Sequence, residues 1–340
     1  MSLSFYDPYL KALEAELKEV FAPREGFLYD VLRYHMGWID QQGAAEDTPL
    51  PFHFQSVLAL LTCEALSGDF HAALPSAAGI ELVLNFVAVH SDVQSARLQA
   101  AVRPSVWWIW GPAQAINAGD GLHALGRTTI MRLAQRDVPA DRVLRAVASL
   151  DRACLTMCEG QYMDLEFQDQ LMVTSHAYYD MIRRKTAALA ECSAELGAIA
   201  AGGDDGVCEA FREVGASLAM AWQINQDVAD LWGQHGDGMT PSNVLDKKKS
   251  LPLIHALENA PISSKRELGN IYMKRVLQPE DVAQIITILD ESGSRQFSLD
   301  KARELAQQAI ERLDGSGLAQ ERLTPLRLLC QQELDGGTHG

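Results

Sequence analysis

The stretch over residues 219–232 combines an apolar helical pattern with four polar side chains that could bind a charged ligand. It reads A-M-A-W-Q-I-N-Q-D-V-A-D-L-W. Residues three or four positions apart share a helix face, so Gln223 lies beside Asp227 and Gln226 beside Asp230. Burying a carboxylate costs several kcal/mol unless it gains a cation, a metal or hydrogen bonds. The pattern therefore favours a functional interior; the alternative is a solvated stripe on a half-buried helix.

The composition of the chain excludes several classes of function. Its 340 residues carry a formal net charge of −16, with an isoelectric point near 4.9. Nucleic acids and anionic membrane surfaces would repel such a protein, so neither is expected as a partner. Six scattered cysteines without a signal peptide form no disulfide framework and favour the cytoplasm. No apolar run reaches the roughly eighteen residues of a membrane span, so no transmembrane segment is expected.

Helical periodicity continues along the chain. The apolar spacing predicts helices over 8–21, about 25–40, 54–66, 76–100, 112–135, 140–168, 174–201, 207–232, 249–258, 263–275, 279–291 and 298–313. Alternating strand patterns and long linkers are absent from the sequence. We therefore predict one all-α domain over residues 1–335, followed by a flexible tail over residues 336–340.

Three of the predicted helices are apolar almost all round, namely those that contain residues 77–89, 113–125 and 187–200. Such helices must be surrounded by other helices, so the pattern predicts a helical bundle. Ligand sites in bundles lie between facing helices. Polar residues in the interior are therefore the candidate ligand contacts.

Five ordered blocks of the sequence resemble the trans-isoprenyl diphosphate synthase, or polyprenyl synthetase, family. The blocks are RPSVWWIWGPAQAINAGD (103–120), CEGQYMDL (158–165), MIRRKTAAL (181–189), QINQD (223–227) and DKKKSLPL (246–253). The resemblance implies an α-helical bundle around a deep central cavity. It also implies an enzyme that binds an allylic diphosphate through Mg²⁺ held by two aspartate-rich motifs, ionises it, and joins the cation to isopentenyl diphosphate.

The implied reaction explains why carboxylates and cations are needed together. Heterolysis leaves a highly charged diphosphate and a carbocation, so positive groups must neutralise the leaving group as the bond breaks. Mg²⁺ takes oxygen ligands in octahedral geometry, and carboxylates on successive helical turns can supply them. Without such groups, ionisation should be slow.

The sequence departs from the family at both aspartate-rich motifs. The first motif, D-D-x-x-D, falls on residues 91–95, where both outer aspartates are serine and only Asp92 remains. The second motif has Gln226 in place of its first aspartate but retains Asp227 and Asp230. The three remaining carboxylates form an incomplete metal site, so we expect Mg²⁺ to bind only together with a diphosphate.

The positions for isopentenyl diphosphate also differ from the family pattern. The R-R-G-R-P stretch falls on residues 100–104 and retains Arg103 as its single arginine. The upstream G-K-R segment falls on Pro51-Phe52-His53. Isopentenyl diphosphate is therefore expected to bind poorly.

The resemblance assigns roles to individual residues of this sequence. Catalytic roles fall on Lys185, Asp227 and Gln223. Diphosphate binding falls on Arg103, Lys185 and Lys248. Metal binding falls on Asp92, Asp227 and Asp230. Cavity-lining roles fall on Phe86, Gln161, Thr186 and Gln226. The alternative interpretations are that Asp92 is a surface carboxylate and that residues 247–249 are a solvated basic run.

Several functions agree with these features. One is an enzyme that acts on an allylic diphosphate by a modified route, as a prenyltransferase with another acceptor or a terpene-synthase-like cyclase. Another is a non-catalytic subunit that modulates an active synthase, and a third is a module that sequesters a prenyl ligand. An unmodified chain-elongating synthase agrees less well with the lost metal ligands. The resemblance also implies a homodimer, or a heterodimer with an active synthase, paired through long bundle helices that include residues 110–120.

Overall fold

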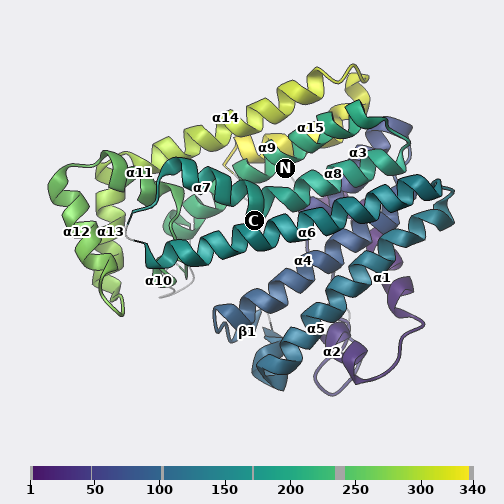
Figure 1. Cartoon of the computed structure of the whole chain (residues 1–340), viewed down its shortest axis with the longest axis horizontal. Helices are drawn as coiled ribbons and strands as arrows, with labels where there is room; N and C mark the ends of the chain where they lie inside the picture. Colours follow the sequence, from purple (N-terminus) through teal and green to yellow (C-terminus); the bar gives the residue numbers. More distant parts are fainter. Residues whose placement is uncertain (1–2, 47, 101–102, 171, 234–241, 337–340) are drawn as a thin grey trace. The chain divides into compact units, whose positions relative to one another are not determined.

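The computed structural model describes residues 3–46, 48–100, 103–170, 172–233 and 242–336, and these are almost entirely helical (Figure 1). The prediction of an all-α fold is confirmed. The strands in the described chain are the two-residue β1 (Gln99–Ala100) and β2 (Arg103–Pro104), which pair antiparallel with Gln99 opposite Pro104. Residues 337–340 of the predicted tail lie outside the described residues.

The chain divides into two compact units. Unit 1 comprises Met1–Asp151 and Cys192–Glu209, and unit 2 comprises Arg152–Glu191 and Ala210–Gly340. The chain passes from one unit to the other within helices α6, α8 and α9, so the division does not coincide with a linker. The division does not test the single domain over residues 1–335, which stays a prediction.

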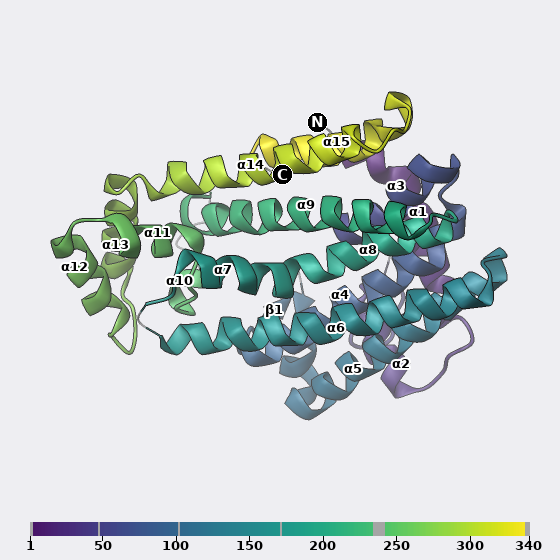
Figure 2. The same ribbon diagram turned by 45° about the horizontal axis from the view of Figure 1, so that its top comes forward.

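Unit 1 contains the N-terminal helices. They are η1 (Leu3–Tyr6), α1 (Asp7–Phe21), α2 (Phe27–His35), α3 (Phe54–Ser67), η2 (His71–Ala73), α4 (Leu74–Gln94), α5 (Val106–Ile130), η3 (Met131–Arg136) and the first part of α6 (Ala140–Asp169). Helices α4 and α5 lie side by side in both views (Figures 1 and 2). Glycines allow this approach, because a Cβ on Gly126 would lie 2.9 Å from the carbonyl oxygen of Gly79.

Unit 2 contains the remaining helices. They are the second part of α6, α7 (Ser175–Ile182), a π-helix (Arg183–Ala187), α8 (Ala188–Ala200, of which the first part belongs here), α9 (Asp205–Trp232, of which the greater part belongs here), α10 (Ser242–Leu245), α11 (Leu251–Asn259), α12 (Ile262–Tyr272), α13 (Pro279–Glu291), α14 (Ser294–Asp314) and α15 (Gln320–Leu334). Helices α14 and α15 run side by side (Figure 2). Buried side chains of α7, α9, α11 and α14 form one apolar cluster beneath the site described below.

Three predicted helices have other boundaries or interruptions in the structure, because the backbone adopts non-helical or π-helical conformations there. The helix predicted over 76–100 ends at Gln94, because Ala96 adopts a left-handed backbone with φ of 48° and the chain turns into β1. Helix α5 begins at Val106, before the predicted start, and is interrupted at Gly111, where φ is 82° and Pro112 follows. The helix predicted over 174–201 is divided by the π-helix.

Other boundaries differ at the two ends of the chain. Helix α2 ends at His35, five residues earlier than the predicted end near residue 40. Helix α15, which contains Pro325 in its first turns, is absent from the predicted helices. Its buried face comprises Leu323, Leu326, Leu329, Cys330 and Glu333, and this short apolar stripe is a weak signal in the sequence.

The three helices predicted to be surrounded by others differ in how deeply they lie. In the stretch 77–89, residues 77–83 and Val89 are buried, whereas residues 84–88 are partly or fully exposed. Residues 187–200 are largely buried, as expected. In contrast, the stretch 113–125 has one exposed side, on which Ile116 is 47% exposed. Within the described chain no other element therefore buries this side of α5.

One helical stretch, His71–Gln94, is long and apolar enough by length and composition to cross a membrane. This stretch differs from the expectation that no apolar run is long enough to span a membrane. Within the structure 67% of its most apolar window is buried. Burial of this extent is typical of the central helix of a folded domain, so the length of the helix is weak evidence for a membrane span.

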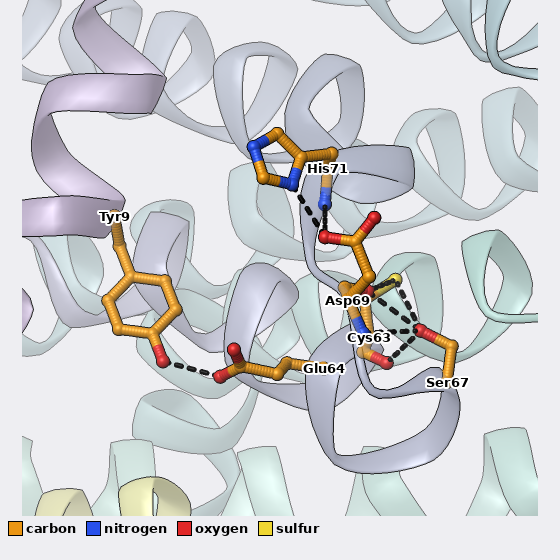
Figure 3. Close-up of polar contacts among 6 residues, drawn as sticks. All are labelled: Tyr9, Cys63, Glu64, Ser67, Asp69 and His71. Carbon is orange, nitrogen blue, oxygen red and sulfur yellow. Dashed lines mark hydrogen bonds and ion pairs between the residues drawn. The ribbon is translucent and has the colours of Figure 1, made fainter.

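Polar contacts join α3 to α1 and stabilise the turn that follows α3 (Figure 3). The Tyr9 hydroxyl of α1 donates a hydrogen bond to Glu64 of α3, and burial together with this contact raises the pKa of Tyr9. At the end of α3, Ser67 donates to the carbonyl of Asp69 at 2.7 Å, and Asp69 contacts the ring of His71 at 2.5 Å. These contacts close the turn that leads into α4, and we assign them a structural role.

Candidate functional site

A small polar pocket lies within unit 2, with a volume of about 40 Å³. It is lined by Asp164, Tyr178, Met181, Ile182, Lys185, Gln223, Asp227, Lys248, Lys249 and Ser250. Four of the residues predicted as site residues, Lys185, Gln223, Asp227 and Lys248, are among them. The pocket therefore gathers residues from four of the five sequence blocks into one place.

The π-helix between α7 and α8 positions two of the predicted residues, Lys185 and Thr186. A π-helical turn is rare and occurs often at functional sites. Close packing accompanies it, because a Cβ on Gly160 of α6 would lie 2.6 Å from the Cα of Lys185 and 2.8 Å from the carbonyl carbon of Arg184. Only glycine at position 160 lets α6 approach this backbone so closely.

The ammonium group of Lys185 forms an ion pair with Asp164 of α6. The Nζ–Oδ2 distance is 2.5 Å, and Asp164 is 4% exposed. Sequence reasoning did not single out Asp164, although it lies three positions after Gln161 in a matched block. That spacing on a helix was the available signal. The ion pair compensates the charge of the buried carboxylate.

Asp227 of α9 accepts three hydrogen bonds, from donors on α7, α9 and the beginning of α11. Its donors are the Tyr178 hydroxyl at 2.7 Å, the Gln223 side-chain amide at 3.0 Å and the Leu251 backbone N–H at 3.1 Å. Burial raises the pKa of Asp227 to about 6, although the hydrogen bonds act in the opposite direction. The carboxylate therefore joins α7, α9 and the beginning of α11.

Gln223 connects this carboxylate to the π-helix. The Thr186 hydroxyl donates to the side-chain oxygen of Gln223 at 2.7 Å, while the Gln223 amide nitrogen donates to Asp227. The orientation of the Gln223 amide follows from these two partners. Thr186, predicted as a cavity residue, is thus linked to the pocket through Gln223.

Lys249 also lines the pocket, although sequence reasoning gave more weight to Lys248. The side chain of Lys249 is 5% exposed, and its ammonium donates to the carbonyl oxygens of Gln168 at 3.3 Å and Lys247 at 3.2 Å. It also lies 5.3 Å from the centre of the Tyr272 ring. Burial, reinforced by the nearby Lys247, lowers the pKa of Lys249 to about 8.

Three other predicted residues of unit 2 are not among those that line this pocket. Gln161, Gln226 and Asp230 are half-buried. The negative charge of Asp230 contributes to a raised pKa of Tyr272, after the larger effect of burial. The predicted cavity-lining roles of Gln161 and Gln226 stay predictions. The predicted metal-binding role of Asp230 also stays a prediction.

Unit 1 holds the remaining predicted residues, Asp92, Phe86 and Arg103. Asp92 of α4 is 5% exposed and lies 3.7 Å from the Arg97 guanidinium; burial raises the pKa of Asp92 despite this cation. The ring of Phe86 contacts the rings of His90 and His123. The metal-binding and cavity-floor roles of Asp92 and Phe86 stay predictions.

The guanidinium of Arg103 already has several partners. It donates to the Tyr34 carbonyl at 2.9 Å, to Glu46 at 3.0 Å and to the Thr48 hydroxyl at 3.1 Å. It also lines an open pocket of about 710 Å³ together with Tyr34, Asp40, Gln41, Gln42, Glu46, Thr48 and Pro104. A diphosphate at Arg103 would compete with Glu46, and the predicted role of Arg103 stays a prediction.

His53, which stands where the family has a cationic residue, is also paired. Its Nδ1 lies 2.8 Å from Glu81, whose other oxygen accepts from Ser56 at 2.6 Å. Burial alone would lower the pKa of His53, but the charge and hydrogen bond of Glu81 raise it. When His53 is protonated, its charge is thus paired with the buried Glu81 carboxylate of α4.

The donors present do not form a complete magnesium site. In the ranges that the structure describes, no group of three His, Cys, Asp or Glu side chains gathers closely enough to hold a metal ion. Asp227 already accepts from three donors, and Asp164 is paired with Lys185. A magnesium ion here would need most of its oxygens from a ligand.

A comparison with protein families decides where the chain belongs. The polyprenyl synthetase model matches residues 53–289. The chain belongs to the polyprenyl synthetase family. A geranylgeranyl diphosphate synthase of Mycobacterium tuberculosis is 31% identical over 303 residues, which cover 88% of this chain and 85% of that protein. A (2E,6E)-farnesyl diphosphate synthase of Mycobacterium bovis is 27% identical over 314 residues, 90% of this chain and 85% of that protein.

Solved structures of polyprenyl synthetases share the fold. The polyprenyl synthetase of Streptomyces coelicolor superimposes with a TM-score of 0.87 and 28% identity, covering 95% of this chain and 97% of that one. The geranylgeranyl pyrophosphate synthetase of Pyrococcus horikoshii gives a TM-score of 0.84 and 28% identity, covering 98% and 97%. The resemblance proposed from the five sequence blocks is confirmed at the level of family and fold.

Proposed function

We propose that this polyprenyl synthetase family protein binds and ionises an allylic isoprenoid diphosphate at the pocket of unit 2. The observation that carries the proposal is the convergence of Lys185, Lys248 and Lys249 on one pocket that also contains Gln223 and Asp227. The similarity to synthases of geranylgeranyl and farnesyl diphosphate supports this substrate class.

The charges of the pocket suit a leaving diphosphate. Three lysines and two aspartates line it, so an incoming diphosphate meets an excess of positive charge. In the proposed reaction the C1–O bond breaks heterolytically, the electron pair leaves with the diphosphate, and the lysines neutralise it. The allylic cation is then quenched by loss of a proton or by an acceptor other than isopentenyl diphosphate. Magnesium supplied with the ligand would add charge neutralisation to this step.

Farnesyl diphosphate is expected to stabilise the protein against thermal unfolding. A ligand that binds only the folded state stabilises it by RT ln(1 + [L]/Kd), about 2.7 kcal/mol at a hundredfold excess over Kd. Lys185→Ala should weaken binding at least tenfold, because it removes a cation and leaves Asp164 unpaired in the pocket. Melting curves with and without farnesyl diphosphate, at several magnesium concentrations, measure both effects.

The matched control is Lys11→Ala, which removes an exposed lysine of α1 in unit 1. It should leave the ligand-induced shift unchanged. Isopentenyl diphosphate should give a much smaller shift than farnesyl diphosphate. The same titrations test the prediction that magnesium alone has no effect and acts only together with a diphosphate. Absence of any shift with farnesyl diphosphate, at every magnesium concentration, would refute the proposed function.

A non-catalytic subunit is the second candidate function. Specific support comes from the first aspartate-rich motif, where Ser91 and Ser95 supply no charge and the surviving Asp92 faces Arg97. Pyrophosphate release from farnesyl diphosphate distinguishes the two functions. Release by the purified protein supports the enzyme; ligand binding without release, together with an altered product of an added active synthase, supports the subunit.

An exposed apolar stripe lies on the part of α6 that belongs to unit 2. We propose that a second copy of the chain binds to this stripe. Leu155, Tyr162 and Leu165 are 64%, 70% and 41% exposed, and Cys158 between them is exposed as well. Their spacing places them on one face of the helix. Contiguous exposed apolar side chains mark interaction surfaces. The stripe, with the uncovered side of α5, supports the dimer that the family resemblance implies.

Substitution of Leu155 by glutamate should weaken the homodimer at least tenfold, because it places a charge in an apolar interface. Light scattering after size exclusion across micromolar concentrations measures the change. Ile262→Glu is the matched control, since Ile262 of α12 is 70% exposed and lies outside the stripe. A wild-type chain that is monomeric at all these concentrations contradicts the homodimer and leaves a heterodimer with an active synthase to be tested by mixing.

A further inference from the structure

Exposed aromatic side chains gather at the beginning of α5 in unit 1. Trp108 is 58% exposed, and the centre of its ring lies 5.9 Å from that of Trp107. The ring of Trp110 lies 6.3 Å from that of Phe27, which is 62% exposed. Leu98, directly before β1, is 50% exposed. These five residues are called the aromatic surface below.

Hydrogen bonds to the backbone hold the aromatic surface in place. The Trp107 indole N–H donates to the Arg97 carbonyl at 2.7 Å, and the Ser105 backbone N–H donates to the Leu98 carbonyl at 3.0 Å. These contacts join the residues that precede β1 to the first turn of α5. A surface that is ordered before it binds loses little conformational freedom on binding. Because contiguous exposed apolar side chains mark interaction sites, the aromatic surface is expected to have a partner.

The charge near the aromatic surface differs from that of the whole chain. The sequence contains 45 acidic residues but no aspartate or glutamate over residues 93–119, which include four of the five residues of the surface. The side chain of Arg97 in this stretch is 48% exposed. On the α2 side, Glu25 is exposed and Asp30 is paired with Arg33 at 3.0 Å. The stretch that carries most of the surface thus contributes only positive charge, which attracts lipid phosphates.

The tryptophans indicate the class of partner. The indole ring is apolar over most of its area and carries one N–H donor, so tryptophan is enriched where an apolar phase meets water, as at membrane surfaces. We propose that the aromatic surface docks unit 1 onto the interface of a phospholipid bilayer. A zwitterionic bilayer is the expected partner, because the net charge of −16 opposes approach to an anionic one. This inference goes beyond the proposed function, since it concerns a surface of unit 1 and not the pocket of unit 2.

A second copy of the chain is the competing occupant of the aromatic surface. The kink at Gly111, where φ is 82°, interrupts α5 between the tryptophans and the exposed side around Ile116 that supports the dimer. The two surfaces therefore belong to different helical segments. We assign the dimer to the side around Ile116 and the bilayer to the aromatic surface.

Flotation with phosphatidylcholine vesicles tests the docking of the full-length protein. The wild type should bind the vesicles, and Trp108→Glu should lower the partition coefficient at least tenfold, because it places a charge at the apolar contact. Leu98→Glu should have the same effect. Ile262→Glu in unit 2 is the matched control, since Ile262 is 70% exposed and lies outside the aromatic surface. Circular dichroism checks that each variant is folded.

Fluorescence quenching by phosphatidylcholine with brominated acyl chains reports whether the tryptophans enter the bilayer. These lipids should quench the tryptophan fluorescence of the wild type. Trp108→Phe should retain vesicle binding but show less quenching, because phenylalanine keeps an apolar ring and removes one inserted indole. A purely structural role of Trp108 would not produce this combination.

Several results would overturn the inference. One is the absence of binding to phosphatidylcholine vesicles, and another is binding to anionic vesicles alone, which would make the attraction purely electrostatic. Unchanged vesicle binding by the folded Trp108→Glu and Leu98→Glu variants would also overturn it. If brominated lipids do not quench the wild type and Trp108→Glu weakens the dimer in light scattering, the aromatic surface binds a second copy instead.

Discussion

Substitution of Gly160 by alanine should lower the free energy of unfolding by about 2 to 3 kcal/mol, because the added methyl group has no room. It would lie 2.6 Å from the Cα of Lys185 and 2.8 Å from the carbonyl carbon of Arg184. Both are backbone atoms of the π-helix, which cannot move aside as a flexible side chain can. Urea denaturation measures the loss. The displaced π-helix should also weaken the binding of farnesyl diphosphate, since it carries Lys185.

Gly206 near the beginning of α9 is the matched control. A Cβ there would meet only the Asp204 carboxylate, at 3.5 Å. Gly206→Ala should therefore leave stability unchanged or raise it by about 0.5 to 1 kcal/mol, because alanine is the better helix former. Equal stability of the two alanine variants would show that α6 does not pack against the π-helix as described.

The stability contributed by Asp227 should fall as the pH rises. Its folded pKa, about 6, is above its ordinary value of 3.8, so the folded protein binds the proton more tightly than the unfolded chain does. The contribution is therefore complete below pH 3.8 and is lost as the pH rises through about 6. Between pH 4 and pH 7 the loss should be about 2 kcal/mol. Its physical cause is the burial of the ionised carboxylate.

Asp227→Asn isolates this effect, because it has nearly the same shape and does not titrate. Urea denaturation of both proteins between pH 4 and pH 7 gives the difference in unfolding free energy, in which the other titrating groups cancel. Relative to the wild type, the asparagine variant should gain stability across this window. A difference that does not vary with pH would mean that Asp227 keeps one protonation state throughout.

Some helix boundaries could be predicted from the local sequence and others could not. The apolar spacing predicted α1, α3 and α13 to within one residue. It did not predict the end of α4 at Gln94 or the π-helix at residues 183–187, because both depend on backbone conformations rather than on apolar spacing. Ala96 adopts a left-handed conformation that alanine rarely prefers, so its residue type carries no signal.

The sequence by itself determined the all-α class, the family resemblance and the four pocket residues Lys185, Gln223, Asp227 and Lys248, because these depend on periodicity and on short ordered blocks. The tertiary structure decided which charges are compensated. Asp164 pairs with Lys185 across 21 positions of the chain, and Tyr178 reaches Asp227 across 49. Burial and pairing arise only when separate helices pack together, so no local pattern could predict that Lys185 would compensate the buried Asp164.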